Sequence, residues 1–191
     1  MDSKFHEDRT FINQHFNENE VNYKEFENCI FKNCDFSNEI YASTKFIGCT
    51  FDNCNLSMTK LNNCHLVDIS FKDCKILGVN FNDCIDFLFE VNFESCILDY
   101  SSFSRKKLQK TVFKDSSLKN VDFMESDLTK AIFSNCDLFS ANFFKTKLIE
   151  VNFSTAINYS IDPEMNSIKK ARFSLHGIGG LLHKYDIKIE R

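Results

Sequence analysis

The sequence predicts an all-β fold: a single right-handed β-helix, a rod built from five-residue repeats. Two observations predict it. A large apolar residue returns at every fifth position over most of the 191 residues, and a small residue returns two positions before it. A period of five fits neither an α-helix, at about 3.6, nor a β-strand, at about 2, so the chain must turn a corner at every repeat. Four such corners complete one coil with a square cross-section.

The large residues fall into two registers, separated by a break between Phe81 and Phe93. In the first register they are Phe11, Phe16, Val21, Phe26, Phe31, Phe36, Tyr41, Phe46, Phe51, Leu56, Leu61, Leu66, Phe71, Ile76 and Phe81. In the second register Phe and Leu alternate from Phe93 to Phe153. These side chains are predicted to fill the core of the rod.

The residue two positions before most of the large ones is small, and it forms a second inward row. All nine cysteines lie on this phase, as Cys29 and Cys34 illustrate. A buried cysteine behaves as a small hydrophobe, so packing is favoured over metal binding or a disulfide framework. Asn or Asp often stands between the two, as at Asp35 and Asn142, and is predicted to face outward at a corner.

Composition and charge limit the function. The chain has 22 Phe, one Pro and five Gly, a charged start, and no apolar run near the ~20 residues of a membrane span, so a cytoplasmic protein is expected. Residues 1–100 carry 17 acidic and 8 basic residues (net −9), whereas residues 101–191 carry 10 and 15 (net +5). The rod is predicted to have an acidic and a basic half.

No catalytic, metal or cofactor residues are predicted. The five histidines are scattered, and residues 176–180 lack the Lys-Ser/Thr ending of a phosphate-binding loop. The basic cluster of Arg105, Lys106, Lys107 and Lys110 is interpreted as a solvated edge in preference to a phosphate contact. Direct nucleic-acid binding is therefore not expected.

The break at residues 82–92 adds two residues, which must bulge from the coil. Leu88 falls into the second register, which leaves Ile85, Phe87 and Phe89 outside both registers. Two alternatives stay open: these residues form an exposed contact surface, together with Asp86 and Glu90, or they fold back over the coil.

The C-terminal residues depart from the pattern. Residues 1–8 are predicted as an N-terminal cap, 9–173 as the β-helix and 174–191 as a capping and dimerisation segment. A helix that begins after Ser174 and a strand with alternating Ile187 and Ile189 are expected there. An open β-helix end needs a cap or a partner, which favours a tail-to-tail homodimer. Its predicted interface is Leu175, Ile178, Leu181, Leu182, Tyr185 and Ile187.

The triplets Ala-Asn-Phe at 141–143 and Val-Asn-Phe at 151–153 resemble the repeat unit of the pentapeptide-repeat family. The resemblance covers roughly residues 9–158 and implies a quadrilateral β-helix with twenty residues in each coil. Phe93, Phe113, Phe133 and Phe153 would then stack as a core ladder on one side.

Three segments are similar to the Qnr and MfpA branch of this family: Asn-Leu-Ser-Met-Thr at 55–59, residues 76–81, and the ending from Leu181 to Ile189. That resemblance implies a dimeric rod that mimics duplex DNA, binds DNA gyrase or topoisomerase IV and protects it from quinolones. Asp35, Asp52 and Asp73 are the acidic contacts it suggests. A general protein-interaction scaffold is the alternative. A broad acidic stripe would favour mimicry, and evenly mixed charges would favour the scaffold.

Overall fold

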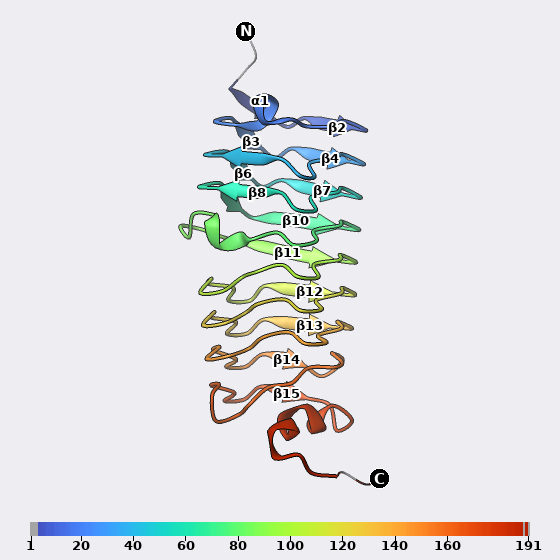
Figure 1. Cartoon of the computed structure of the whole chain (residues 1–191). Coiled ribbons are helices and arrows are strands. Elements are labelled where there is room, and N and C mark those ends of the chain that lie inside the picture. Colours follow the sequence, from blue (N-terminus) through green and yellow to red (C-terminus); the bar gives the residue numbers. More distant parts are fainter. Residues whose placement is uncertain (1–3, 189, 191) are drawn as a thin grey trace.

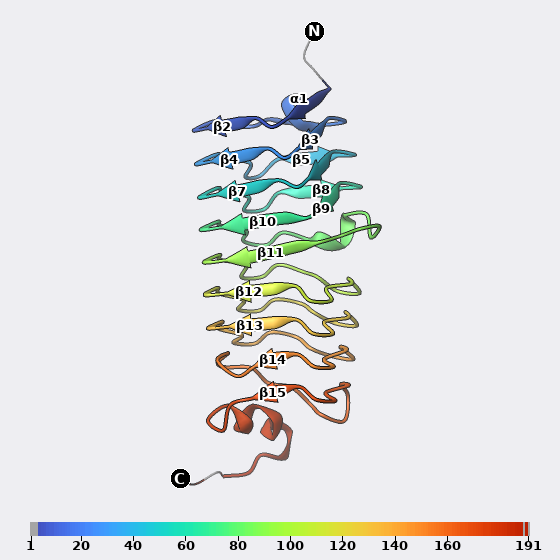
Figure 2. The ribbon, with the colours of Figure 1, turned by 180° about the vertical axis from the view of Figure 1, so that it is seen from behind.

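The computed structural model describes residues 4–188 and 190, which form one rod of stacked coils (Figure 1; Figure 2). Every strand pair is parallel, as in a right-handed quadrilateral β-helix, so the predicted fold class is confirmed. Within the described residues, no helix has the length and apolar character needed to cross a membrane.

One side of the rod is a nine-stranded parallel sheet, which we call the long face (Figure 1). Its strands, in sheet order, are β2 (Thr10–Ile12), β4 (Ile30–Lys32), β7 (Thr50–Asp52), β10 (Ile69–Lys72), β11 (Val91–Glu94), β12 (Val112–Lys114), β13 (Ile132–Ser134), β14 (Asn152–Phe153) and β15 (Arg172–Phe173). Each strand comes from a successive coil, so the sheet runs almost the full length of the rod.

The other three sides are paired less continuously. In chain order after the long face, the second side has isolated parallel bridges from His15 to Ile157. The third side carries α1 (Glu18–Val21), β5 (Ile40–Ala42), β8 (Lys60–Asn62) and the 3-10 helix η1 (Phe81–Asp83). The fourth side carries β1 (Phe5–Glu7), β3 (Glu25–Glu27), β6 (Lys45–Ile47) and β9 (His65–Val67). Because β1 already pairs with β3, the coils begin inside the segment expected to be a cap.

Strand registers measure the length of each coil. Phe31 pairs with Phe51 and Phe113 with Phe133, which gives twenty residues per coil. Between β10 and β11 the offset is 22, since Ser70 pairs with Asn92. The two-residue bulge predicted at the break is therefore confirmed.

The corners depend on a residue two positions after each large one, which adopts a left-handed conformation. Asn33 (φ 53°), Asn53 (φ 52°) and Gly48 (φ 61°) are examples. Asn, Asp and Gly tolerate this conformation best, so few glycines are needed. Where Asn or Asp stands before a large residue, it also shapes the turn, because its side chain accepts a hydrogen bond from the backbone N–H two residues later, as Asp35 does from Ser37 at 3.0 Å.

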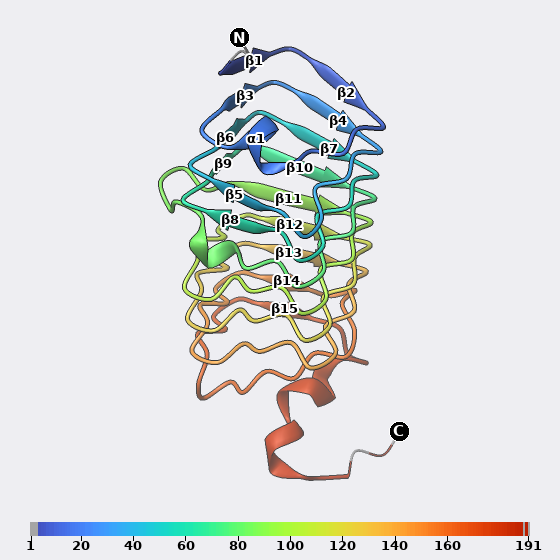
Figure 3. The ribbon, with the colours of Figure 1, turned by 45° about the horizontal axis from the view of Figure 1, so that its top comes forward.

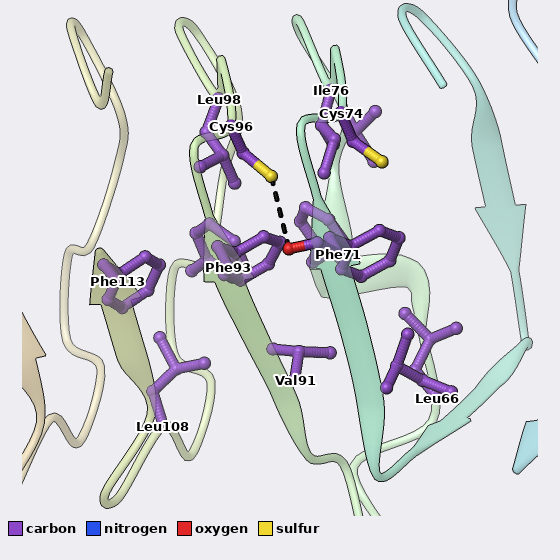
Figure 4. Close-up of a cluster of buried hydrophobic side chains, with 14 of the residues drawn as sticks. Leu66, Phe71, Cys74, Ile76, Val91, Phe93, Cys96, Leu98, Leu108 and Phe113 are labelled. Atoms are coloured by element: carbon purple, nitrogen blue, oxygen red, sulfur yellow. Dashed lines mark hydrogen bonds between the residues drawn. The ribbon is translucent and has the colours of Figure 1, made fainter. Parts of the chain in front are cut away.

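Large side chains from successive coils stack as ladders in the core (Figure 4). The Phe113 ring is stacked on Phe93 at 5.3 Å and on Phe133 at 4.8 Å between centroids, with interplanar angles of 9° and 5°. Rings of the third side, Phe103 and Phe123, meet it edge-on at 6.0 and 5.8 Å. Both geometries are favourable for aromatic pairs. The predicted ladder from Phe93 to Phe153 is present.

The C-terminal segment covers the last coil, but the single helix expected after Ser174 is wrong. It is replaced by two 3-10 helices, η2 (Ile178–Leu181) and η3 (His183–Tyr185). Residues 187 and 188 are not in a strand, and residue 189 lies outside the described residues. Two glycines explain the difference. A Cβ on Gly177 would lie 2.2 Å from the Tyr159 hydroxyl, and one on Gly180 would lie 2.3 Å from the Tyr159 carbonyl oxygen. The glycines allow close packing on the coil.

Ionic contacts hold this cap in place. The Lys184 ammonium lies 2.7 Å from carboxylate oxygens of both Asp162 and Glu164. The Ile161 amide of the last coil donates to the Gly180 carbonyl at 2.9 Å. Hydrogen bonds from Lys184 hold the pKa of Asp162 and of Glu164 below their usual values of 3.8 and 4.5.

Acidification is expected to release the cap. A carboxyl whose pKa is lowered in the folded state stabilises that state above its unfolded pKa, and the contribution is lost as the pH falls through the folded value. Protection of the Ile161 amide from hydrogen exchange should therefore decrease as the pH is lowered from 6 to 3. A Lys184→Met variant should show weaker protection that depends less on pH. Equal pH dependence in both proteins would contradict this assignment.

Candidate protein-interaction surface

The most unusual surface feature is the bulge, residues 82–90, where the two extra residues leave the coil (Figure 1). Phe87 is 72% exposed and Leu88 is 61% exposed at its tip. Leu88 adopts a left-handed conformation, with φ of 57°, which is rare for a branched side chain. The chain thus holds two adjacent large apolar side chains out into solvent.

Two predictions about the bulge are corrected. Leu88 was expected to point inward and is exposed, whereas Phe89 is buried at 9% exposure. Phe89 packs edge-on against Phe81 at 6.3 Å. The two extra residues move the inward-facing position from residue 88 to residue 89, because Val91 must still pair with Ile69 on the long face. The two alternatives for the bulge are both realised in part: Phe87 is exposed, Phe89 folds back over the coil, and Ile85 is half-buried.

Lys106 fixes the path of the bulge, and its role was missed from the sequence. Its side chain is only 2% exposed, so it is not part of a solvated edge. Its ammonium donates to the Cys84 carbonyl and to an Asp86 carboxylate oxygen, both at 2.5 Å, and lies 4.9 Å from the centre of the Phe89 ring. One signal could have revealed it: Lys106 stands two positions before Leu108, on the small-residue phase, where a long side chain needs extra space.

The bulge carries carboxylates around its apolar tip, although Asp86 is paired with Lys106, and Glu90 lines a surface hollow together with Lys107 and Lys110 of the next coil. Asp83, Asp86 and Glu90 are exposed on it. From Lys75 to Arg105 the sequence contains no other lysine or arginine, and five carboxylates. The predicted contacts Asp86, Phe87 and Glu90 are therefore brought together on one exposed segment.

The other predicted acidic contacts lie elsewhere. Asp52 is on β7 of the long face, 3.7 Å from Lys32. Asp35 is on the second side, 3.5 Å from His15. Asp73 occupies a corner next to the long face. These residues belong to different coils and do not form one continuous acidic stripe with the bulge.

The predicted dimer residues are at the C-terminal end of the rod. Leu175, Ile178, Tyr185 and Ile187 are exposed, Leu175 at 82%. Leu181 instead packs against the core, and Leu182 is half-buried. The exposed residues give this end an apolar surface.

All nine cysteines are buried and unpaired, as the repeat phase predicts. Most of their thiols donate to backbone carbonyls; the Cys49 sulfur lies 3.3 Å from the Phe26 oxygen, and Figure 4 shows Cys96 bonded to the Phe71 carbonyl. Burial raises the pKa of Cys49 to about 12 and of Cys136 to about 11. In residues 4–188 and 190, no three His, Cys, Asp or Glu side chains are grouped to hold a metal ion.

The thiols are expected to react slowly in the native protein. The thiolate is the reactive form, and burial shields all nine sulfurs from the reagent. A raised pKa, as at Cys49 and Cys136, suppresses the thiolate further, whereas a hydrogen bond with Cys74 lowers the pKa of Cys96. With a chromogenic disulfide reagent at pH 8, native protein should release little colour over minutes, and denatured protein should titrate nine thiols. Rapid modification of several cysteines in the folded state would contradict the inward assignment.

These features define a class, a parallel β-helix with one corner for every five residues. Two family models describe the same architecture: "Pentapeptide repeat region" matches residues 24–85, and "Pentapeptide repeats (8 copies)" matches 88–123 and 107–143. Their 62 and 56 residues add up to 118 of 191. The chain belongs to the pentapeptide-repeat family.

Solved structures of the same architecture are similar at low sequence identity. QnrB1, a plasmid-mediated fluoroquinolone resistance protein, is 18% identical, with a TM-score of 0.47 over 96% of this chain and 100% of that chain. HetL, a pentapeptide-repeat protein involved in regulating heterocyst differentiation in the cyanobacterium Nostoc, is 14% identical, with a TM-score of 0.37 over 90% and 89% of the two chains. No curated protein sequence matches the chain.

Proposed function

We propose that this protein is a cytoplasmic binding protein whose partner is a type II topoisomerase, DNA gyrase or topoisomerase IV, which it protects from quinolones. The observation that carries the proposal is the bulge. Phe87 and Leu88 are held outward on a segment whose neighbours Asp83, Asp86 and Glu90 are acidic. Exposed apolar residues within a charged rim are typical of a protein-contact site.

The charge of the bulge supports this choice of partner. An enzyme that binds DNA presents a basic surface to phosphates, and the exposed carboxylates of the bulge can contact such a surface through complementary charge. The sequence resemblance at residues 55–59 and 76–81 to the Qnr branch points to the same enzymes. In this proposal the exposed apolar residues at the C-terminal end join two rods into a homodimer.

A supercoiling assay tests the proposal. Gyrase inhibited by a fluoroquinolone should recover supercoiling activity when micromolar protein is added. A Phe87→Ser/Leu88→Ser variant should lose this effect, because the apolar contact is removed without changing the core. Phe139→Ser is the matched control, since Phe139 is 57% exposed on the second side, away from the bulge. Unchanged drug-induced DNA cleavage with intact protein would reject a topoisomerase partner.

A general scaffold with another partner is the second candidate, and the distribution of charge favours it. Ion pairs link residues twenty apart in successive coils, such as Glu25 with Lys45 at 3.0 Å and Arg105 with Glu125 at 2.9 Å. Positive and negative charges are thus mixed along the described sides. Salt dependence separates the two candidates, because a mimic of DNA should lose affinity steeply as salt rises.

A further inference from the structure

The long face presents two parallel rows of outward side chains. No other segment of the described chain lies over this sheet (Figure 1; Figure 3). The first row precedes each core phenylalanine and includes Ile30, Thr50, Ser70, Asn92, Val112 and Ile132. The second row follows each phenylalanine and includes Lys32, Asp52, Lys72, Glu94 and Lys114. Ile30 and Ile132 are each 37% exposed.

Charge alternates along the second row, from positive at Lys32 to negative at Asp52 and onward to positive at Lys114. Contacts within the chain account for part of this alternation, since Lys32 lies 3.7 Å from Asp52 and Lys114 contacts Glu94. Lys72 has no such close pair among the ion pairs of the described residues. The first row is uncharged over the same coils, so ion pairs within the chain do not explain which residues occupy it.

We propose that the long face is a self-complementary interface for a second copy of this chain. A two-fold axis that runs parallel to the strands, midway between β10 and β11, would place two rods face to face and antiparallel. Each coil of one rod then faces the coil of the other copy that lies at the same distance on the opposite side of the axis in the sequence. In the first row, Ile30 meets Ile132 of the second copy and Thr50 meets Val112, so branched side chains face each other.

The same axis pairs opposite charges in the second row. Lys72 meets Glu94 of the second copy, and Asp52 meets Lys114. Because the interface is isologous, each contact occurs twice. Complementary charges fix the register of such an interface more than they add to its affinity.

Other positions of the axis lose one of the two matches. Moving it by one coil in either direction places Ile30 opposite Asn92 or Arg172. Moving it by half a coil, onto β10, sets Lys32 opposite Lys114 and Lys72 opposite itself. Only the axis between β10 and β11 satisfies both rows.

Nothing in the described chain obstructs this arrangement. Pairing of β10 with β11 is regular across the axis, because the extra residues leave the coil after the third side. The bulge projects at the left of the rod in Figure 3, whereas β2, β4 and β7 lie at the right. Nine strands about 4.8 Å apart give a long but narrow contact. We therefore expect a weak dimer, at the small end of stable interfaces.

Cross-linking of mixed variants tests the register. Ile30→Cys and Ile132→Cys proteins, each with a different tag, are mixed and treated with a short bismaleimide that spans roughly the 10 Å between packed sheets. The native cysteines are buried, so the new thiols should dominate. We expect cross-linked heterodimers in the mixture, at least fivefold more than cross-linked homodimers in either protein alone. Equal yields would overturn the proposed axis.

Sedimentation of charge variants gives an independent test. Lys72→Glu should weaken self-association at least tenfold, and the added Glu94→Lys substitution should restore most of it. Lys60→Glu is the matched control, since Lys60 is exposed on β8 of the third side and, like Lys72, has no close ion pair among the described residues. These variants are compared in an Ile187→Asp background, which removes the association through the C-terminal end proposed above. Loss of all self-association in that background, or self-association there that Lys72→Glu leaves unchanged, would mean that the long face is not an interface and that the proposal is wrong. These tests do not depend on the partner proposed above.

Discussion

Replacing Phe113 with alanine is expected to lower the free energy of unfolding by about 3–5 kcal/mol. The Phe113 side chain is fully buried and stacked between Phe93 and Phe133. Its removal leaves a cavity between coils that neighbouring rings cannot fill, because each ring is fixed by its own strand. Denaturant unfolding monitored by far-UV circular dichroism measures the change.

Lys114→Ala provides the matched control for this ladder. Lys114 is the next residue on the same strand, and its exposed side chain contacts Glu94 across one coil. Exposed ion pairs contribute little to stability, so the midpoint of unfolding should hardly move. A loss similar to that of Phe113→Ala would mean that the inward and outward positions had been interchanged.

The repeat period predicted most of the core because each coil meets the same requirement. A narrow coil has room for one large and one small side chain on each side, so composition at these positions is strongly restricted. Positions such as Phe51 and Phe133 could therefore be assigned from spacing alone, and both are buried. Phe11, in the first coil, is only partly buried, since it has a described coil on one side only.

The bulge could not be predicted in the same way, because the period does not restrict inserted residues. Spacing from Phe93 assigned Leu88 to the core, but contacts of Phe89 with Phe81 and with Lys106 decide which side chain enters. The glycines at 177 and 180 illustrate a similar limit. Their close approach to Tyr159 is a tertiary contact that no local pattern reveals.

Substitutions at Asp86 and Lys106 are expected to have unequal effects, although the two residues form one ion pair. Asp86 is 69% exposed, whereas the Lys106 side chain is buried. Asp86→Ala leaves the buried ammonium with only the Cys84 carbonyl and the Phe89 ring, and should lower the free energy of unfolding by about 2–4 kcal/mol. Lys106→Met keeps a similar apolar stem and leaves a carboxylate that water can solvate. This substitution should lower the free energy of unfolding by about 1–2 kcal/mol, because the Cys84 carbonyl loses its hydrogen bond from Lys106.

A double-mutant cycle makes this asymmetry testable. Once Lys106 is methionine, removing Asp86 should cost almost nothing, so the double variant should match Lys106→Met and be more stable than Asp86→Ala alone. Hydrogen exchange at residues 84–90 should increase in all three variants, because the ammonium fixes the path of the bulge. Additive losses would show that the two side chains act independently, and unchanged exchange would show that Lys106 does not hold the bulge. With the bulge released, Phe87 and Leu88 would lose their fixed outward position, so the same variants should also weaken any contact made through them.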